Sequence, residues 1–293
     1  MVPRVAVGLP FFNSVDTLAG AIRSVFSQSF SDWELVLVDD GSTDGSLEIA
    51  RSVKDPRVRV YSDGRNRSLS SRLNEIALLA RAPLLARMDA DDLMYPRRLE
   101  RQVQFLDAHP EVDVVGTGIC TIDGERRPNG KRGVAPLDLR TFCVAIRGVF
   151  IHPTVMGRTV WFLANPYDTR IPRAQDYELW LRTFRRSSFS TLPEMLTFYS
   201  EVLDGTLDRI RCSHTSRMDA LRRAHNRDFP RWLPPAVMAC MSLKMAVYRF
   251  LWTMGFRRYL LLRRNAPLSV DEVNEALSTL EFVLSFPVSG LNG

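Results

Sequence analysis

Short apolar runs alternate with stretches of helical spacing along the first hundred residues. Four continuous apolar runs predict buried strands, at residues 4–9, 33–38, 58–61 and 84–88. Between them, apolar residues recur every three or four positions at 18–26 and at Leu69–Leu79, which predicts helices. Strands that are apolar throughout and separated by helices are typical of a mainly parallel sheet covered on both faces. We therefore predict an α/β fold with a Rossmann-like, mainly parallel sheet between helices.

The remainder of the chain is less regular. A helix is expected at 93–106, directly after the fourth predicted strand. We expect a basic, turn-rich loop at 124–133, a short strand at 151–156 and a helix at 178–184. Beyond about residue 205 the pattern becomes helical and basic.

The composition is that of an ordinary folded protein, with 45% hydrophobic and 25% charged residues. Its 293 residues suffice for one large α/β domain with an appendage, or for two modest domains. The four cysteines form no CxxC pair, which argues against a zinc site or a disulfide framework and for a reducing compartment. The first apolar run is too short for a secretory signal, so we expect a cytoplasmic protein.

The charge is unevenly distributed along the chain. Residues 209–264 contain 13 Lys or Arg against two acidic residues, so the rest of this +6 chain carries a net charge of −5. This asymmetry suggests a C-terminal region that meets an anionic surface, either a membrane or nucleic acid. The alternative is a solvated helical face with no partner.

An acidic cluster, Asp89, Asp91 and Asp92, follows the fourth predicted strand directly. Three carboxylates so close together repel one another unless a cation or hydrogen-bond donors compensate. Hard oxygen ligands of this kind suit Mg²⁺ or Mn²⁺, which protein carboxylates commonly hold together with phosphate oxygens. The alternative is that these residues cap and charge the N-terminus of the helix expected at 93–106.

A second acidic motif, Asp39-Asp40-Gly41-Ser42-Thr43-Asp44, follows the second predicted strand. A carboxylate here is able to accept a hydrogen bond from a uracil or a ribose hydroxyl, although a plain turn has the same composition. Both acidic motifs lie at the carboxyl ends of strands, where parallel sheets bind their ligands. No GxGxxG follows a strand, which disfavours a dinucleotide fold of the usual kind.

Five motifs, taken in order, resemble the family 2 glycosyltransferases of GT-A fold over about residues 3–200. They are Pro10-Phe11-Phe12-Asn13, Val38-Asp39-Asp40-Gly41-Ser42-Thr43-Asp44, Met88-Asp89-Ala90-Asp91-Asp92 with Pro96-Arg97-Arg98-Leu99, His152-Pro153-Thr154-Val155-Met156, and Gln175-Asp176-Tyr177-Glu178-Leu179-Trp180-Leu181-Arg182. The resemblance implies a nucleotide-sugar donor, a divalent metal (Mn²⁺ or Mg²⁺) and inversion at the anomeric carbon. It also implies a catalytic domain at 1–205, with a donor half at about 1–115, an acceptor half at about 116–205 and a basic helical extension at 206–293.

The resemblance assigns roles to individual positions. The residues expected to bind the donor are Pro10, Phe12, Asp39, Asp40, Arg72 and Asp89. Of these, Pro10 and Asp39 lie by the nucleobase with Asp40 nearby, and Asp89 faces the ribose. Arg72 and Asn74 belong to the helix that closes over the donor, where Arg72 reaches nucleobase or phosphate. Asp91 holds the metal, Asp176 is the general base on the acceptor hydroxyl, and His152 contacts the acceptor or the leaving diphosphate. Asp176 precedes apolar residues of helical spacing, so the alternative for it is a helix cap, and His152 is otherwise a strand-end residue.

Some positions depart from the family pattern. Ser68 replaces a common Gly, Asn74-Glu75-Ile76 lacks a frequent one, and Ala82-Pro83 replaces a Gly-containing turn. These changes leave the metal and base positions intact but affect the segment that shapes the donor pocket. They therefore leave the identity of the donor open. The sequence leans to a uridine nucleotide but identifies neither the sugar nor the acceptor.

The stretch at 236–256 is apolar apart from Ser242, Lys244, Arg249 and Thr253. Two cations near its middle make a membrane span costly. The flanking arginines instead favour a helix lying in the plane of an anionic membrane surface, and with it a lipid-linked sugar rather than a free protein as the acceptor. The alternative is a helix packed on the catalytic domain or in a homo-oligomer.

Two other functions compete with glycosyl transfer. A nucleotidyltransferase also places carboxylates and a metal against phosphates, but the basic phosphate loop it normally needs near the N-terminus is missing, since residues 8–20 contain no basic residue. A non-enzymatic anion-binding module would use the basic tail. That tail contains no recognised nucleic-acid motif, so no nucleic acid is expected as a partner.

Overall fold

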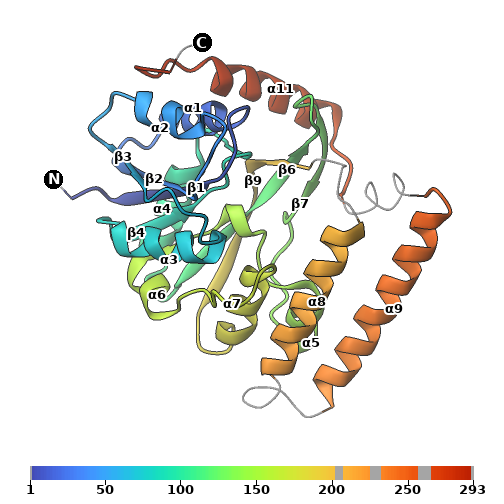
Figure 1. The fold of residues 1–293 in the computed structure, drawn as a ribbon. Helices are drawn as coiled ribbons and strands as arrows, with labels where there is room; N and C mark the ends of the chain where they lie inside the picture. The colour runs from blue at the N-terminus through green and yellow to red at the C-terminus, as the bar shows by residue number, and fades with distance from the viewer. Residues whose placement is uncertain (1, 202–206, 225–231, 257–264, 292–293) are drawn as a thin grey trace.

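A computed structural model describes residues 2–201, 207–224, 232–256 and 265–291. Within these ranges nine strands form one sheet in the order β3-β2-β1-β4-β8-β6-β9-β5, with β7 paired to β6 (Figure 1). The strands are β1 (Val5–Phe11), β2 (Trp33–Asp39), β3 (Val58–Ser62), β4 (Leu84–Arg87), β5 (Leu93–Met94), β6 (Val114–Ile122), β7 (Pro128–Arg132), β8 (Met156–Arg158) and β9 (Phe189–Ser200).

Most helices connect these strands, and two long helices, α8 and α9, follow the last strand. They are α1 (Leu18–Phe26), α2 (Ser46–Ser52), α3 (Leu69–Leu79), α4 (Arg98–Ala108), α5 (Thr141–Arg147), the 3₁₀ helix η1 (His152–Thr154), α6 (Thr159–Ala164), α7 (Gln175–Thr183), α8 (Leu207–Ala224), α9 (Leu233–Thr253) and α11 (Val270–Ser285). Among the described residues, no helix combines the length and the apolar character that crossing a membrane requires.

The first four strands of the sheet are parallel neighbours, as the continuous apolar runs predict. Strand β1 lies between β2 and β4, and β2 pairs with β3, all in parallel register. Beyond β4 the sheet becomes mixed, because β8 runs antiparallel to β4 while β6 and β9 pair in parallel. The predicted α/β fold with a mainly parallel sheet between helices is confirmed.

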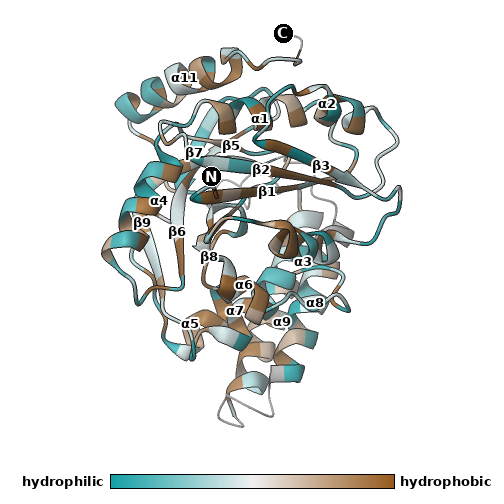
Figure 2. Ribbon diagram, turned by 90° about the vertical axis from the view of Figure 1, so that its left-hand side faces the viewer, coloured by the Kyte–Doolittle hydropathy of each residue, from teal (hydrophilic) through white to brown (hydrophobic). Residues whose placement is uncertain are grey.

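Helices cover both faces of the sheet, which is why β1 and β2 are buried along their whole length. One face packs against α1, α2, α4 and α11, and Val5, Val7 and Leu9 of β1 point to it. The other face packs against α3 and α5 to α9, and the intervening residue Ala6 points there. Figure 2 shows the hydrophobic strands β1 and β2 between these two helical layers.

The C-terminal helix α11 returns to the N-terminal half and packs on α1. It begins with a reciprocal cap, in which Ser269 and Glu272 each accept from the other's backbone N–H. Past its end, the Phe286 carbonyl accepts a hydrogen bond from Arg23 at 2.8 Å, and the Ser289 carbonyl accepts from the Lys54 N–H at 2.8 Å. The boundary predicted at 205–206 lies outside the described residues and stays a prediction.

Three expected elements differ from the structure. The helix expected at 93–106 begins only at Arg98, because Leu93 and Met94 instead form β5 against β9 and Pro96 follows them. The basic loop at 124–133 contains strand β7, which pairs with β6. The strand expected at 151–156 is replaced by η1, which contains Pro153, followed by β8.

Candidate active site

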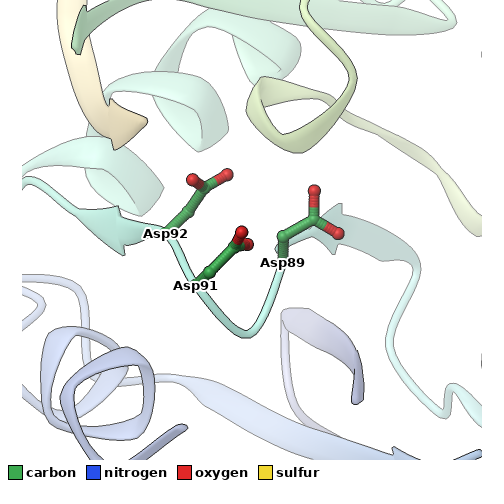
Figure 3. A group of neighbouring side chains, drawn as sticks. All are labelled: Asp89, Asp91 and Asp92. Atoms are coloured by element: carbon green, nitrogen blue, oxygen red, sulfur yellow. The ribbon is translucent and has the colours of Figure 1, made fainter. Parts of the chain in front are cut away.

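The acidic cluster occupies the turn between β4 and β5, at the carboxyl end of β4. Oxygen atoms of Asp89, Asp91 and Asp92 lie within 4.8 Å of one another, and the three side chains point to the same side of the turn (Figure 3). The cluster is no helix cap, because α4 begins at Arg98 with Arg97 in the cap position. The alternative explanation of these carboxylates as the start of a helix is therefore wrong.

Burial and mutual repulsion raise the pKa of two of these carboxyls. Asp92 is 1% exposed, and burial together with the charges of Asp91 and Asp89 raises its pKa well above the usual range. Asp91 is exposed, yet protein surrounds it on most sides, and burial and then the charge of Asp89 raise its pKa to about 6. One carboxylate oxygen of Asp92 accepts from the Ser200 N–H at 2.9 Å.

The residues present fit a divalent cation. The second oxygen of Asp92, Oδ2, is buried and has no hydrogen-bond partner among the described protein atoms. Buried polar atoms are normally satisfied, so an unpaired oxygen beside two further carboxylates indicates room for a positively charged ligand. The oxygen-only donor set is the one preferred by Mg²⁺ and Mn²⁺.

Two buried arginines lie behind the acidic turn. Arg87, at the end of β4 and 4% exposed, donates through both terminal nitrogens to the two carboxylate oxygens of Asp89. Burial alone would lower the pKa of Arg87, but the charge and hydrogen bonds of Asp89, together with Tyr167 and Asp92, more than offset it and the pKa is raised. Arg98 is fully buried, and it donates to the Arg87 carbonyl at 2.8 Å. Burial lowers the pKa of Arg98 to about 9, against the opposing charge of Asp92.

The second acidic motif lies at the carboxyl end of β2. Asp39 is 1% exposed and accepts hydrogen bonds from the Ser42 N–H at 2.9 Å and the Ser62 hydroxyl at 2.7 Å. Burial raises the pKa of Asp39, but the hydrogen bonds from Ser42 and Ser62 outweigh it, so the pKa is lowered and the carboxylate stays ionised. The predicted role of Asp39 toward the nucleobase stays a prediction.

Arg72 links this motif to the loop that precedes α3. Its guanidinium, 1% exposed, donates to Asp40 at 2.8 Å, to Asp63 at 2.6 Å and to Glu75 at 2.8 Å. Asp40 also accepts from the N–H of Arg67 at 2.7 Å. Burial opposes the charge on Arg72, but these carboxylates raise its pKa. The structure thus places Arg72 as a positioning residue for residues 63–68, and its predicted contact with nucleobase or phosphate stays a prediction.

Pro10 and Phe12 lie beside Asp39, as expected for neighbouring parallel strands. Pro10 is opposite Val38 in the register of β1 and β2, and the Asp40 N–H donates to the Phe11 carbonyl at 2.8 Å. Pro10 is buried, whereas Phe12 follows the strand and is 47% exposed. The exposed ring of Phe12 therefore lies at the same sheet edge as the two acidic motifs.

Asp176 is the second residue of α7 and does not cap it. The cap position is Ala174, whose φ of 59° is in the left-handed region, and within this described segment no side chain caps the helix. Asp176 is only partly exposed, because protein atoms surround most of its side chain. This burial raises the pKa of Asp176 above the ordinary value. The helix-cap explanation is not supported by this geometry, while the role as general base stays a prediction.

His152 lies on η1 and is 8% exposed. Its Nε2 shares a hydrogen bond of 2.9 Å with the Tyr167 hydroxyl. Burial, and then the nearby charge of Arg87, lowers the pKa of His152 well below its usual value, so the ring is neutral. Tyr167 is held by Asn74, whose side-chain amide bonds the Tyr167 backbone in both directions at 3.0 and 2.8 Å.

Arg87 connects the acidic cluster with the residues expected to meet the acceptor. Its charge lowers the pKa of Asp91 and of Asp176, and it also acts on His152 and Tyr167. Arg87 is therefore close enough to act electrostatically on the carboxylates after β4 and on Asp176 at the start of α7. Arg87 was missed by sequence reasoning, although a charged residue inside an apolar strand was a usable signal. Tyr167 lies in an irregular segment and gave none.

Comparison with known proteins agrees with this arrangement. Residues 6–186 match the family model described as glycosyl transferase family 2. The chain is 38% identical over 193 residues to EpsE of Bacillus subtilis, a match that covers 62% of this chain and 67% of EpsE. It is 30% identical over 174 residues to the O-antigen biosynthesis glycosyltransferase WbnJ of Escherichia coli, covering 55% of this chain and 64% of that protein. These matches span about two thirds of each relative's length.

Two solved structures share the fold at low sequence identity. TarS 1–349 of Staphylococcus aureus superposes with a TM-score of 0.63 at 18% identity, covering 96% of this chain and 81% of that one. The mannosyltransferase PcManGT of Pyrobaculum calidifontis gives 0.61 at 16% identity, covering 97% and 88%. The fold is therefore GT-A-like, as the sequence motifs implied.

Proposed function

The chain belongs to glycosyl transferase family 2, and we propose that it transfers a sugar from a nucleotide diphosphate donor to an acceptor hydroxyl, with inversion. The observation that carries this proposal is the acidic turn after β4, where three carboxylates converge beside a buried arginine that also acts on Asp176. Such a site offers both requirements of the reaction. It has ligands for a cation against the leaving diphosphate and a separate carboxylate for the attacking hydroxyl.

We propose that Asp91 holds the cation, with Asp92 beside it, and that Asp89 faces the donor ribose. When bound, Mn²⁺ or Mg²⁺ supplies positive charge against the diphosphate as the bond to the sugar breaks. Asp39 and the exposed ring of Phe12 lie at the same sheet edge, where the nucleobase would be received. Arg87 holds the two oxygens of Asp89 in a fixed orientation, which positions Asp89 before the donor arrives.

Asp176 is assigned as the base that removes the proton of the acceptor hydroxyl during attack. A base with a pKa closer to neutrality holds the proton more firmly, and burial raises the pKa of Asp176 in that direction. His152 is neutral and hydrogen-bonded to Tyr167. We therefore propose that His152 contacts the acceptor or the diphosphate as a neutral donor or acceptor of hydrogen bonds, rather than as a cation.

A hexose or an N-acetylhexosamine carried by UDP is the donor we favour. Structures of TarS with UDP-GlcNAc and of PcManGT with GDP-Man and Mn²⁺ share this fold, so the scaffold is compatible with either base. The pyrimidine is favoured on the acidic motif after β2, which the sequence matches to a uracil contact. The relative WbnJ is named for O-antigen biosynthesis, which supports a carbohydrate or lipid-linked acceptor and a place in polysaccharide or glycolipid synthesis.

Thermal unfolding with nucleotides and metal tests this proposal. UDP with Mn²⁺ should raise Tm, and EDTA should abolish the rise, because ligands that bind only the native state stabilise it. With a UDP-sugar and Mn²⁺, slow hydrolysis should release UDP and free sugar. Release of UMP and a sugar 1-phosphate instead would identify nucleotidyl transfer and refute the proposal, and a nucleotide-dependent rise in Tm that is indifferent to EDTA would refute the metal site.

A further inference from the structure

The second half of α9 is an apolar helical segment whose large side chains are mostly exposed within the part of the chain that the structure describes. We call residues 242–256 the α9 arm. The first half of α9 is packed, with Leu233 2% and Val237 0% exposed. In the arm, large apolar side chains are more than half exposed: Leu243 (68%), Phe250 (64%), Met254 (58%) and Phe256 (53%), with Val247 at 50%. Figure 1 shows α9 at the outer edge of the molecule, beyond α8.

These exposed side chains form a stripe along one face of the helix. Leu243, Val247, Phe250 and Met254 are spaced by four, three and four residues, which places them on one side of an α-helix. Scattered single apolar residues are normal on a protein surface, whereas a contiguous apolar patch marks an interaction site. The stripe is therefore a candidate interaction surface.

The charges around the stripe identify the chemistry of its occupant. Residues 232–256 contain two cations, Lys244 and Arg249, and no acidic residue. Over residues 209–264 the sequence contains 13 basic residues against two acidic ones. A second copy docked on the same face would bring like charges together, which costs free energy. An anionic lipid surface complements both features, since its acyl region accepts the stripe and its phosphates accept the cations.

We propose that the α9 arm docks on an anionic membrane, with the apolar stripe in the interfacial region and Lys244 and Arg249 at the headgroups. The arm is joined to the candidate active site through packed helices. Helix α9 packs on α8, and α8 packs on α7. In the second contact the Arg217 guanidinium lies 4.2 Å from the ring centre of Tyr177, the residue after Asp176. Membrane docking then holds the helix that carries Asp176 close to the bilayer, and, if the proposed function holds, favours an acceptor carried on a lipid.

Vesicle flotation of the full chain tests the docking surface without any donor or acceptor. The protein should float with vesicles of phosphatidylcholine and phosphatidylglycerol at 3:1 and much less with phosphatidylcholine alone, and added salt should weaken the binding. Leu243→Asp/Phe250→Asp should lower partitioning at least about tenfold, because each methylene kept out of the bilayer weakens binding about fourfold. Lys244→Gln/Arg249→Gln should lower it about tenfold or more on anionic vesicles only.

The matched control is Leu78→Asp/Val160→Asp, which adds the same charge at apolar residues that are 76% and 70% exposed on α3 and α6. This variant should float like the unmodified chain, and all variants should keep its Tm. Equal loss of flotation in both aspartate doubles would overturn the proposal. The proposal would also be overturned if the unmodified chain did not bind vesicles but formed dimers in light scattering, and Leu243→Asp/Phe250→Asp dissociated those dimers. The occupant of the stripe would then be a second copy of the chain. Donor hydrolysis is measured separately, so a chain that floats as expected but hydrolyses no UDP-sugar refutes the proposed function and leaves the docking surface standing.

Discussion

Replacing Asp176 by Asn separates catalysis from stability at the start of α7. The substitution keeps the size of the side chain and removes its charge and its ability to take a proton. As a general base, Asp176 contributes about two to four orders of magnitude in rate, which corresponds to about 3–5 kcal/mol of activation free energy. We expect Asp176→Asn to lose that much transfer to acceptor, with UDP affinity nearly unchanged.

Two small and opposing terms decide the effect on stability. A carboxylate in the first turn of a helix is stabilised by the helix dipole by up to about 1 kcal/mol, and Asn loses this. Burial raises the pKa of Asp176, so the ionised form is less favourable in the folded protein than in the unfolded chain, and Asn removes that cost. Because the Asp176 side chain does not cap the helix, no further loss is expected. The free energy of unfolding should therefore change by less than about 1 kcal/mol.

The sign of the pH dependence follows from the raised pKa. The folded state binds the proton of Asp176 more tightly than the unfolded chain, whose pKa is near the ordinary 3.8. The contribution of this group to stability is thus fully present below pH 3.8 and is lost as the pH rises through the folded value. Relative to the unmodified chain, Asp176→Asn should gain in Tm between pH 4 and neutrality, as about one ionisation is removed.

Transfer of labelled sugar to an acceptor, UDP-dependent Tm and urea unfolding together measure these three quantities. Asp16→Asn, on the loop before α1, is a suitable control for loss of one negative charge and should leave all three unchanged. A variant Asp176→Asn that transfers sugar normally but unfolds at lower urea would make Asp176 a structural residue. The base would then have to be sought at Glu178 or His152.

Three further predictions concern the metal, the buried charge network and the C-terminal turn. Asp91→Ala should abolish the Mn²⁺-dependent rise in Tm with UDP while leaving Tm without ligand similar. Arg72→Met should lower the free energy of unfolding, measured in urea, by about 3 kcal/mol. This is the low end for a broken buried ion pair, because two of the three carboxylate partners of Arg72 are partly exposed. The control Arg97→Met, at a solvent-exposed arginine, should lower it by less than about 1 kcal/mol. Gly290→Ala should lower Tm clearly more than Gly64→Ala. Both glycines have a positive φ, 93° at Gly290 and 69° at Gly64, but only at position 290 would the new Cβ lie 1.8 Å from a backbone oxygen.

Each of these expectations has a clear contrary result. Retained Mn²⁺-dependent stabilisation in Asp91→Ala would move the metal to Asp89 and Asp92. Equal urea midpoints for Arg72→Met and Arg97→Met would mean that the buried guanidinium contributes no more than an exposed one. Similar Tm values for the two glycine variants would mean that the C-terminal turn does not rest on α2 as the structure shows.

The sequence predicted the elements whose pattern is local and failed where pairing is distant. Helix α3 was predicted with its observed bounds, and β1 to β4 within two residues, because their apolar runs end at polar turns. The start of the helix expected at 93–106 was wrong because Leu93 and Met94 pair with β9, about a hundred residues further along the chain, and the helix begins at Arg98. No local periodicity encodes such a pairing, and for the same reason β6 and β9 were not foreseen as parallel neighbours.

The candidate site divides in the same way. Asp89, Asp91 and Asp92 are adjacent in sequence, so their convergence was predictable from a strand that ends in carboxylates. Long-range partners were not predictable. Arg72 reaches Asp40 because the loop between β3 and α3 brings α3 back beside the end of β2. Tyr167 contacts His152 only after the irregular segment between α6 and α7 folds back.

Arg87 explains why the acidic turn is stable before a cation or donor binds. Three ionised carboxylates in one turn repel one another, and this repulsion is reduced both by the buried guanidiniums of Arg87 and Arg98 and by the raised pKa of Asp91 and Asp92. Full compensation would leave no attraction for a divalent cation, and no compensation would make the turn costly to fold. A bound cation would favour the ionised forms of Asp91 and Asp92, and the unpaired oxygen of Asp92 leaves room for it. Arg87 also lowers the pKa of Asp176 against the effect of burial, so one buried residue holds the donor side in place and keeps the proposed base closer to its ionised form.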